Sequence, residues 1–315
     1  MKTRDVAGCV GTAALLLLAS IYIPIAGGLF SLLTPVPVIY YSTKLGTERG
    51  VKLVGIILLV AGVIAAATRY AHLLFLCIEF SLLGLIISEL FRRKMSIGYT
   101  VLLGTGLTLL IGFVVLAVAG LSKNKTPLEM VLAYLRGSLS ENIDFYKAME
   151  MNGENALSAR EYLRFLLDTI MKVYPALTVI GTGFVVWINV IISRPLLRIR
   201  NLPHPDFGPM DRWGAPETMV WGLIGAGFSL FLPWPSLRSV ALNAVMVFLV
   251  IYFFHGLSIL VFYLNKYRVP SWIRIGVYAL ILFQQIFAIV LSLAGLFDQW
   301  IDLRRIHPKK AEIVK

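Results

Sequence analysis

Nine apolar stretches dominate this sequence, and several reach the roughly 20 residues that a helix needs to cross the hydrocarbon core of a membrane. Apolar and polar residues do not alternate with a period of two, so these stretches predict helices rather than strands. The sequence therefore predicts an all-α integral membrane protein, a polytopic helical bundle of about nine transmembrane helices, or eight if one stretch does not cross. The predicted helices occupy residues 6–25, 29–43, 51–67, 71–91, 97–120, 171–193, 217–232, 237–264 and 274–297.

The composition excludes a water-soluble domain of this size. Of the 315 residues, 58% are hydrophobic and 15% are charged, which is more apolar material than a soluble domain of this length can bury. The net charge of +12 does not indicate nucleic-acid binding, because no basic helix carries interleaved aromatic residues. We therefore expect the lipid bilayer as a partner and no nucleic acid.

The short connections between the apolar stretches predict the orientation, because lysine and arginine collect on the cytoplasmic side. With a cytoplasmic N-terminus, the inner segments carry 15 basic residues, whereas the short outer segments carry only Arg69 and Arg238. Nine crossings would, however, leave the basic tail, residues 301–315, on the outer side. Either this tail is an exception, or one apolar stretch does not cross.

The polar segments divide the chain into regions. Residues 121–168 are rich in both charge signs and contain helix-like patterns such as TPLEMVLAYLRGSL, which predict an amphipathic helical insert. The connector RPLLRIRNLPHPDFGPMDRWGAPE has too many prolines and glycines to predict a helix. The expected regions are a five-helix membrane region 1–120, the insert 121–168, a sixth helix 169–193, a Pro-rich loop 194–216, a three-helix region 217–300 and a basic tail 301–315.

Two prolines interrupt the shortest apolar stretch, at Pro35 and Pro37. A broken backbone at membrane depth is tolerated only where it is buried in protein or lines a cavity, because its carbonyls need partners. Short helices interrupted by proline recur at transporter binding sites. We therefore predict that Pro35 and Pro37 lie at a ligand-binding cavity.

Three segments together resemble one bacterial family. They are TPVPVIYYSTKLG at residues 34–46, Asn189 followed by RPLLRIR and a proline-rich link to Trp213, and YFFHGLSILVFYLNK with GLFDQWIDLRR near the C-terminus. The chain resembles the YybS-like bacterial membrane proteins over nearly its whole length, a family without established activity.

This resemblance implies a bacterial cytoplasmic (inner) membrane protein. It also implies that the N-terminal half is similar to the S components of energy-coupling-factor vitamin transporters. In those transporters the S component is the subunit that binds the substrate. The first six predicted helices match the helix count of such components, whereas the insert and the three further helices depart from it.

Polar groups within the apolar stretches are the candidate binding residues, because such groups are costly in a membrane. The functional interpretation places them in a polar cavity for a small solute or a proton, and the alternative is that each one hydrogen-bonds a neighbouring helix. The candidates are Glu79, His255, Asn189, Asn243, Gln284 and Gln285.

Small residues at helical spacing, Ala7, Gly11 and Ala14, predict a packing face on the first helix, either inside the protein or against a transporter partner. No P-loop, HExxH, GxSxG or CxxC motif is present, and the four histidines lack metal-ligand spacing. We expect no enzyme activity, no catalytic residue, no metal and no cofactor.

Two functions remain. The first is a transport-related protein that binds a small solute, working with a separate transporter partner. The second is a membrane scaffold that recruits envelope or signalling proteins through the insert at residues 121–168.

Overall fold

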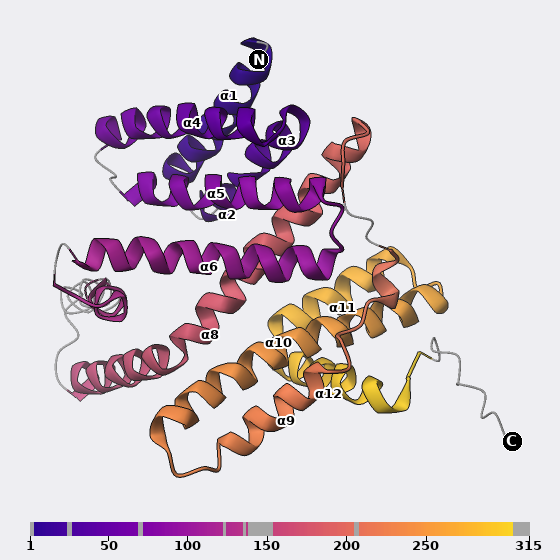
Figure 1. Cartoon of the computed structure of the whole chain (residues 1–315). Coiled ribbons are helices and arrows are strands. Elements are labelled where there is room, and N and C mark those ends of the chain that lie inside the picture. The colour runs from indigo at the N-terminus through magenta and orange to yellow at the C-terminus, as the bar shows by residue number, and fades with distance from the viewer. Residues whose placement is uncertain are drawn as a thin grey trace, which may run out of the picture. The chain divides into compact units, whose positions relative to one another are not determined.

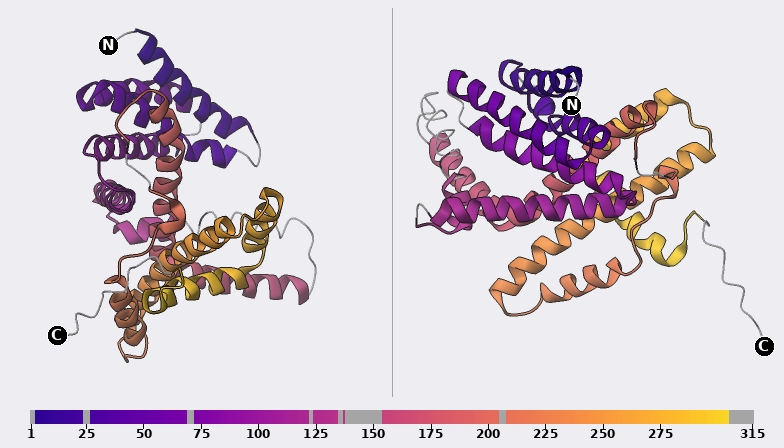
Figure 2. Two further views of the ribbon diagram at one scale, coloured as in Figure 1. Left: turned by 90° about the vertical axis from the view of Figure 1, so that its right-hand side faces the viewer. Right: turned by 45° about the horizontal axis from the view of Figure 1, so that its top comes forward.

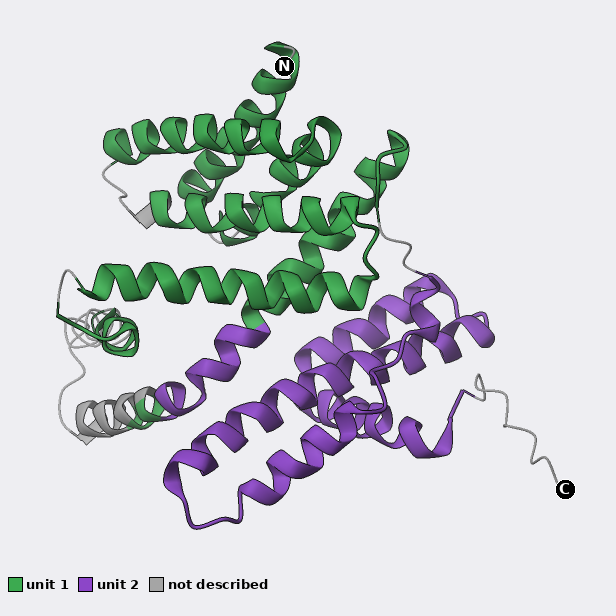
Figure 3. Ribbon diagram, in the orientation of Figure 1, with its two compact units in different colours: residues 1–168, 181–206 green, residues 169–180, 207–315 purple. Residues whose placement is uncertain are grey.

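The computed structural model describes residues 3–23, 27–68, 72–121, 124–134, 137, 154–204 and 208–304. All elements of secondary structure in these residues are α-helices or 3-10 helices (Figure 1). The helices are α1 (Thr3–Tyr22), α2 (Gly27–Leu32), α3 (Pro35–Leu45), α4 (Thr47–Thr68), α5 (His72–Arg92), α6 (Ile97–Leu121), α8 (Glu154–Ile199), η1 (Met210–Arg212), α9 (Met219–Ser229), α10 (Pro235–Lys266), α11 (Ser271–Phe283) and α12 (Gln285–Ile301). The chain forms two compact units, residues 1–168 with 181–206, and residues 169–180 with 207–315 (Figure 3). The boundaries of these units differ from those of the expected regions, because the predicted sixth helix is divided between the two units.

Six helices in the described part of the chain are long and apolar enough to cross a membrane, namely α1, α4, α5, α6, α8 and α10. The pair α11–α12 counts as a seventh if its two halves form one broken span. The all-α membrane class is therefore confirmed. The count of nine is not, because α3 and α9 have only 11 residues each, or about 17 Å of helix.

Helix α8 contains 46 residues, which corresponds to a path of about 69 Å along the helix axis. It joins two regions that the sequence analysis keeps apart, since it begins inside the insert and runs on through the sixth predicted helix. It also continues through Pro195 to Ile199, so the start of the expected Pro-rich loop is helical. The apolar periodicity of this segment outweighs the proline, which removes only one backbone donor.

The N-terminal unit has an apolar core among α1, α3, α4 and α5. Helix α1 contributes Cys9, Ala13 and Leu17, which recur every four residues and so share one helix face. Helices α4 and α5 lie side by side and complete this core (Figures 1 and 2). The expected face of Ala7, Gly11 and Ala14 does not pack inside, because Ala7 and Gly11 are exposed and Ala14 is half-buried.

The C-terminal unit is built on a close contact between α10 and α12. Gly256 lies against the carbonyl of Leu291, and Gly295 lies against the carbonyl of Tyr252. A β-carbon at either glycine would collide with backbone atoms. These two glycines therefore set the distance between the helices.

Helices α11 and α12 form a hairpin instead of the single predicted helix 274–297. The two helices meet at Gln284 with a bend of 101°. Ser292 Oγ donates to the Leu249 carbonyl at 3.2 Å, and the Tyr263 hydroxyl donates to the Leu303 carbonyl at 2.7 Å. Helix α12 therefore runs along α10 in the same direction, and the hairpin starts and ends near the C-terminal end of α10.

Residues 127–134 form a short helix within the expected insert. Thr126 Oγ1 accepts from the N–H of Glu129 at 3.2 Å, and the N–H of Thr126 donates to Glu129 Oε2 at 2.7 Å. This reciprocal pair is a capping box, which the sequence TPLE encodes. Most of the insert lies outside the described residues.

Candidate functional site

Pro35 and Pro37 lie at the start of α3, where they separate it from α2. In an unbroken helix the carbonyl of Leu32 would accept from the N–H of Val36. Here Val36 donates to Leu33 instead, at 3.0 Å, and Pro35 has no N–H. The carbonyl of Leu32 therefore needs a partner from elsewhere in the protein.

Asn189 of α8 supplies that partner. Its Nδ2 donates to the carbonyl of Leu32 and to the carbonyl of Val185, both at 2.8 Å. The structure thus brings together two features that are 157 residues apart in sequence, the proline pair and the asparagine. Asn189 is completely buried, so the break is closed inside the N-terminal unit.

Asn189, one other residue of α8 and one residue of the α2–α3 turn carry further buried oxygen atoms. The Oδ1 of Asn189, the Oγ1 of Thr34 and the Oγ of Ser193 have no hydrogen-bond partner in the described part of the chain. All three residues are at most 1% exposed. Ser193 lies one turn after Asn189 on the same face of α8, and Thr34 lies two residues beyond Leu32. Buried polar atoms without a hydrogen-bond partner are uncommon in folded proteins, so these three oxygens are candidates for ligand contacts.

Asn243 closes a second proline break, in the C-terminal unit. Its Oδ1 accepts from the N–H of Ala176 at 2.8 Å, and its Nδ2 donates to the carbonyl of Lys172 at 2.9 Å. These are the two backbone groups that would bond each other in α8 if Pro175 did not disturb the helix. Both ends of the Asn243 amide are used, whereas Asn189 keeps an unused oxygen.

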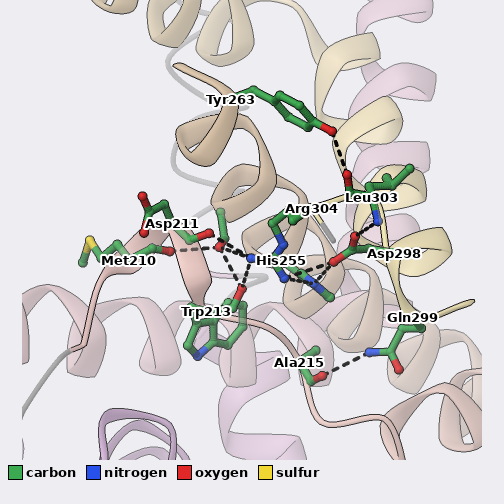
Figure 4. Close-up of polar contacts among 11 residues, drawn as sticks. Met210, Asp211, Trp213, Ala215, His255, Tyr263, Asp298, Gln299, Leu303 and Arg304 are labelled. Carbon is green, nitrogen blue, oxygen red and sulfur yellow. Dashed lines mark hydrogen bonds and ion pairs between the residues drawn. The ribbon is translucent and has the colours of Figure 1, made fainter. Parts of the chain in front are cut away.

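A buried charged cluster joins α10, α12 and the segment around η1 (Figure 4). Arg304 donates through Nη2 to Asp298 Oδ2 at 3.0 Å, and His255 Nε2 lies 3.0 Å from each of these two groups. Arg304 Nη1 donates to the carbonyls of Asp211 and Trp213 at 3.0 and 2.9 Å. One arginine therefore fastens the end of α12 to the η1 segment.

The hydrogen bonds of this cluster connect the end of α12 to the η1 segment, and they do not form the Ser–His–Asp sequence of contacts of a catalytic triad. Ser258 Oγ lies 2.9 and 2.7 Å from the carbonyls of Met210 and Trp213 and accepts from Arg304, so its hydroxyl bonds the backbone of the η1 segment. A neutral His255 can accept from Arg304 or donate to Asp298 through Nε2, but not both at once. The charges of Arg304 and Asp298 balance each other, which lowers the cost of burying them.

The remaining predicted residues, Glu79, His255, Gln284 and Gln285, are not among the residues that contact the two proline breaks. Glu79 is exposed on α5 in the N-terminal unit, whereas His255 has its own carboxylate partner in the C-terminal unit. Gln284 and Gln285 are both exposed, at the bend of the α11–α12 hairpin. The predicted residues thus lie in several different environments and do not form one site within the described part of the chain.

Sequence reasoning missed Asp298 and Arg304. The signal was available, because Asp298 closes an apolar stretch and Arg304 follows it by six residues in GLFDQWIDLRR. An acid at a span end resembles an ordinary interfacial residue, however, and its burial depends on α10.

Two cavities in the described residues are open clefts. One of about 540 Å³ lies at the α3–α4 turn and the end of α5, lined by Gly46, Arg49 and Arg92 among others. The other, of about 420 Å³, lies between α9, α10 and Lys172. Among the described residues, no group of three or more histidine, cysteine or acidic side chains is placed to hold a metal ion.

The long apolar helices, the proline breaks closed by asparagines and the buried ion pair define a polytopic α-helical membrane protein. Residues 12–299 match the family described as "Predicted membrane protein (DUF2232)", and the chain belongs to this family.

The chain is similar to the protein described as "Uncharacterized protein YybS" of Bacillus subtilis (strain 168), with 21% identity over 300 residues, 92% of this chain and 93% of that one. This likeness confirms the resemblance to YybS-like proteins. No solved structure matches the chain.

Proposed function

We propose that this protein is transport-related and that its N-terminal unit binds a small solute at the α2–α3 break. The observation that carries the proposal is the set of buried, unused oxygens on Asn189, Thr34 and Ser193 beside a proline-interrupted helix. Interrupted helices are tolerated in membranes where they line a site, and transporters use them to hold solutes near the middle of the bilayer.

The proposal also rests on the similarity to S components that the sequence motifs imply. Such a protein would bind its solute and depend on a separate transporter partner for energy, since no P-loop is present in the sequence. We propose no enzymatic activity, because His255 lies against an ion pair while Ser258 serves backbone carbonyls.

We place the protein in the bacterial cytoplasmic membrane with a cytoplasmic N-terminus, following the distribution of basic residues. The α11–α12 hairpin supports this orientation. The Tyr263 hydroxyl donates to the Leu303 carbonyl, so the end of α12 lies beside the end of α10 that carries Lys266. A chain that continues from there on the same side would agree with the rule.

The alternative function is a scaffold for envelope or signalling proteins. The packed apolar core of the N-terminal unit favours it, as does the open form of the two clefts. The insert through which a scaffold would act lies mostly outside the described residues.

Native mass spectrometry of the full chain, released from lipid nanodiscs, tests the proposal. We expect a co-purified small molecule or ion that is lost in Thr34→Val and Ser193→Ala. Thr108→Val is the matched control, because Thr108 is also buried with an unpaired hydroxyl, on α6. An empty wild-type protein that retains an envelope protein would favour the scaffold instead.

A further inference from the structure

The backbone at the α2–α3 break has no donor left for a ligand. The N-terminus of a helix normally offers free N–H groups, which bind anions. Here Pro35 and Pro37 have no N–H, Leu33 donates to Phe30 at 3.2 Å, Thr34 donates to Ser31 at 3.1 Å and Val36 donates to Leu33 at 3.0 Å. Every N–H group from residue 33 to residue 37 is therefore absent or already used.

The side chain of Asn189 keeps one acceptor unused beside this break. Its amide cannot be reversed, because Nδ2 faces two carbonyls, those of Leu32 and Val185, and an oxygen in that position would repel both. The unused atom is therefore Oδ1, which can only accept a hydrogen bond or coordinate a cation. The hydroxyl oxygens of Thr34 and Ser193 add two further acceptors.

The charge and size of the site narrow the ligand. Thr34, Asn189 and Ser193 are uncharged, whereas divalent cations prefer carboxylate ligands. The next charged residue along α8, Arg194, is turned about 100° around the helix from Ser193. The three residues are at most 1% exposed, and neither described cleft is lined by them. This burial favours a single ion over an organic molecule, which needs an open cavity.

We propose that a monovalent cation of the size of Na⁺ binds at the α2–α3 break, coordinated by Asn189 Oδ1, Thr34 Oγ1 and Ser193 Oγ, with the carbonyl of Leu32 beside them. This inference rests on the proposed function and names the class of solute for the same site. The two prolines then have a chemical role: they remove the donors that would repel a cation and leave a site made only of oxygen acceptors.

Thermal unfolding of the full chain in nanodiscs tests this, with NaCl, KCl and choline chloride compared at equal ionic strength. Na⁺ is expected to raise the Tm by about 2 °C for each tenfold increase in concentration above its dissociation constant, while choline has no such effect. Thr34→Val and Ser193→Ala are expected to abolish the Na⁺ response. Both should fold, because each removes a hydroxyl without a partner, a change that is neutral or stabilising.

Thr108→Val is expected to keep the full response. The reason is that this part of α6 packs on α8 away from Asn189. Thr105, one turn before Thr108, lies 3.6 Å from the β-carbon position of Gly183. Gly183 is six residues, or about 9 Å along α8, from Asn189. A response that survives in Thr34→Val and Ser193→Ala would overturn the placement of the cation.

A second comparison separates this inference from the proposed function. If salts have equal effects but an organic solute co-purifies and is lost in Thr34→Val, the cation is wrong and the binding site stands. If Thr34→Val raises the Tm equally in all three salts and nothing co-purifies, the break holds at most a water, and both proposals fail.

Discussion

Asn243 fills the hydrogen-bond gap that Pro175 opens in α8. Its amide oxygen accepts from Ala176 N–H at 2.8 Å, and its nitrogen donates to the Lys172 carbonyl at 2.9 Å. One side chain thus replaces a backbone hydrogen bond inside a membrane helix, where no water is available to do so.

We expect Asn243→Ala to lower the free energy of unfolding by about 2–4 kcal/mol, because two buried backbone groups lose their partners. The loss should fall below about 1 kcal/mol when Pro175→Ala is added, since the helix can then close its own ladder. Denaturant titration in detergent micelles measures both values. Ser236→Ala is the control, an exposed polar residue on the same helix. Equal losses with and without Pro175 would show that Asn243 stabilises the protein in another way.

The ion pair of Arg304 and Asp298 predicts a strong effect of single substitutions. Arg304→Ala should cost about 3–5 kcal/mol, because it leaves a buried carboxylate without its partner. Asp298→Asn combined with Arg304→Gln should recover part of that loss. Limited proteolysis reports the release of the segment 208–216, which Arg304 holds through two carbonyls. Arg212→Ala, an exposed arginine in that segment, should leave the cleavage pattern unchanged, and equal cleavage in both variants would argue against the fastening.

The hairpin of α11 and α12 predicts the side of the C-terminal tail. A cysteine at Tyr267, in the loop between α10 and α11, and a cysteine at Lys309 should react with a membrane-impermeant maleimide from the same side. A cysteine at Leu232, before α10, should react from the opposite side. The native Cys9 and Cys77 are buried and should give little background. Labelling of positions 267 and 309 from opposite sides would mean that α11–α12 crosses the bilayer.

The capping box at Thr126 predicts a pH dependence for the helix at 127–134. The hydrogen bonds from the backbone and side chain of Thr126 lower the pKa of the Glu129 carboxyl below 4.5. Its contribution to stability is therefore complete above pH 4.5 and is lost as the pH falls through the lowered pKa. Hydrogen exchange of the Thr126 amide should accelerate, relative to the intrinsic rate, over that acidic range. Glu129→Gln should weaken this dependence, and an unchanged profile would contradict it.

The sequence predicts the helices well where the apolar stretches are long. Helices α4, α5, α6 and α10 lie close to the predicted ranges, because a membrane span is defined by local composition. The hairpin was not predicted, since Gln284 and Gln285 are compatible with a continuous helix and only the packing of α12 on α10 bends the chain there.

The candidate site was predicted in part. Asn189, Asn243 and the proline pair were all identified, but their partners lie 157 and 67 residues away, and a single sequence does not encode such pairs visibly. Thr34 and Ser193 were overlooked because hydroxyls are common in membrane helices and usually bond their own backbone.

Helix α8 takes part in the hydrogen bonds at both proline positions. The N–H of Ala176 donates to Asn243, and the side chain of Asn189 donates to the carbonyl of Leu32. Asn189 follows Ala176 by 13 positions, or about 20 Å along the helix. Adding or deleting one residue in this stretch would turn one contact by about 100° relative to the other. Substitutions at other positions of this stretch should therefore be tolerated more readily than an insertion or deletion, which changes the helical register of Asn189 against Ala176.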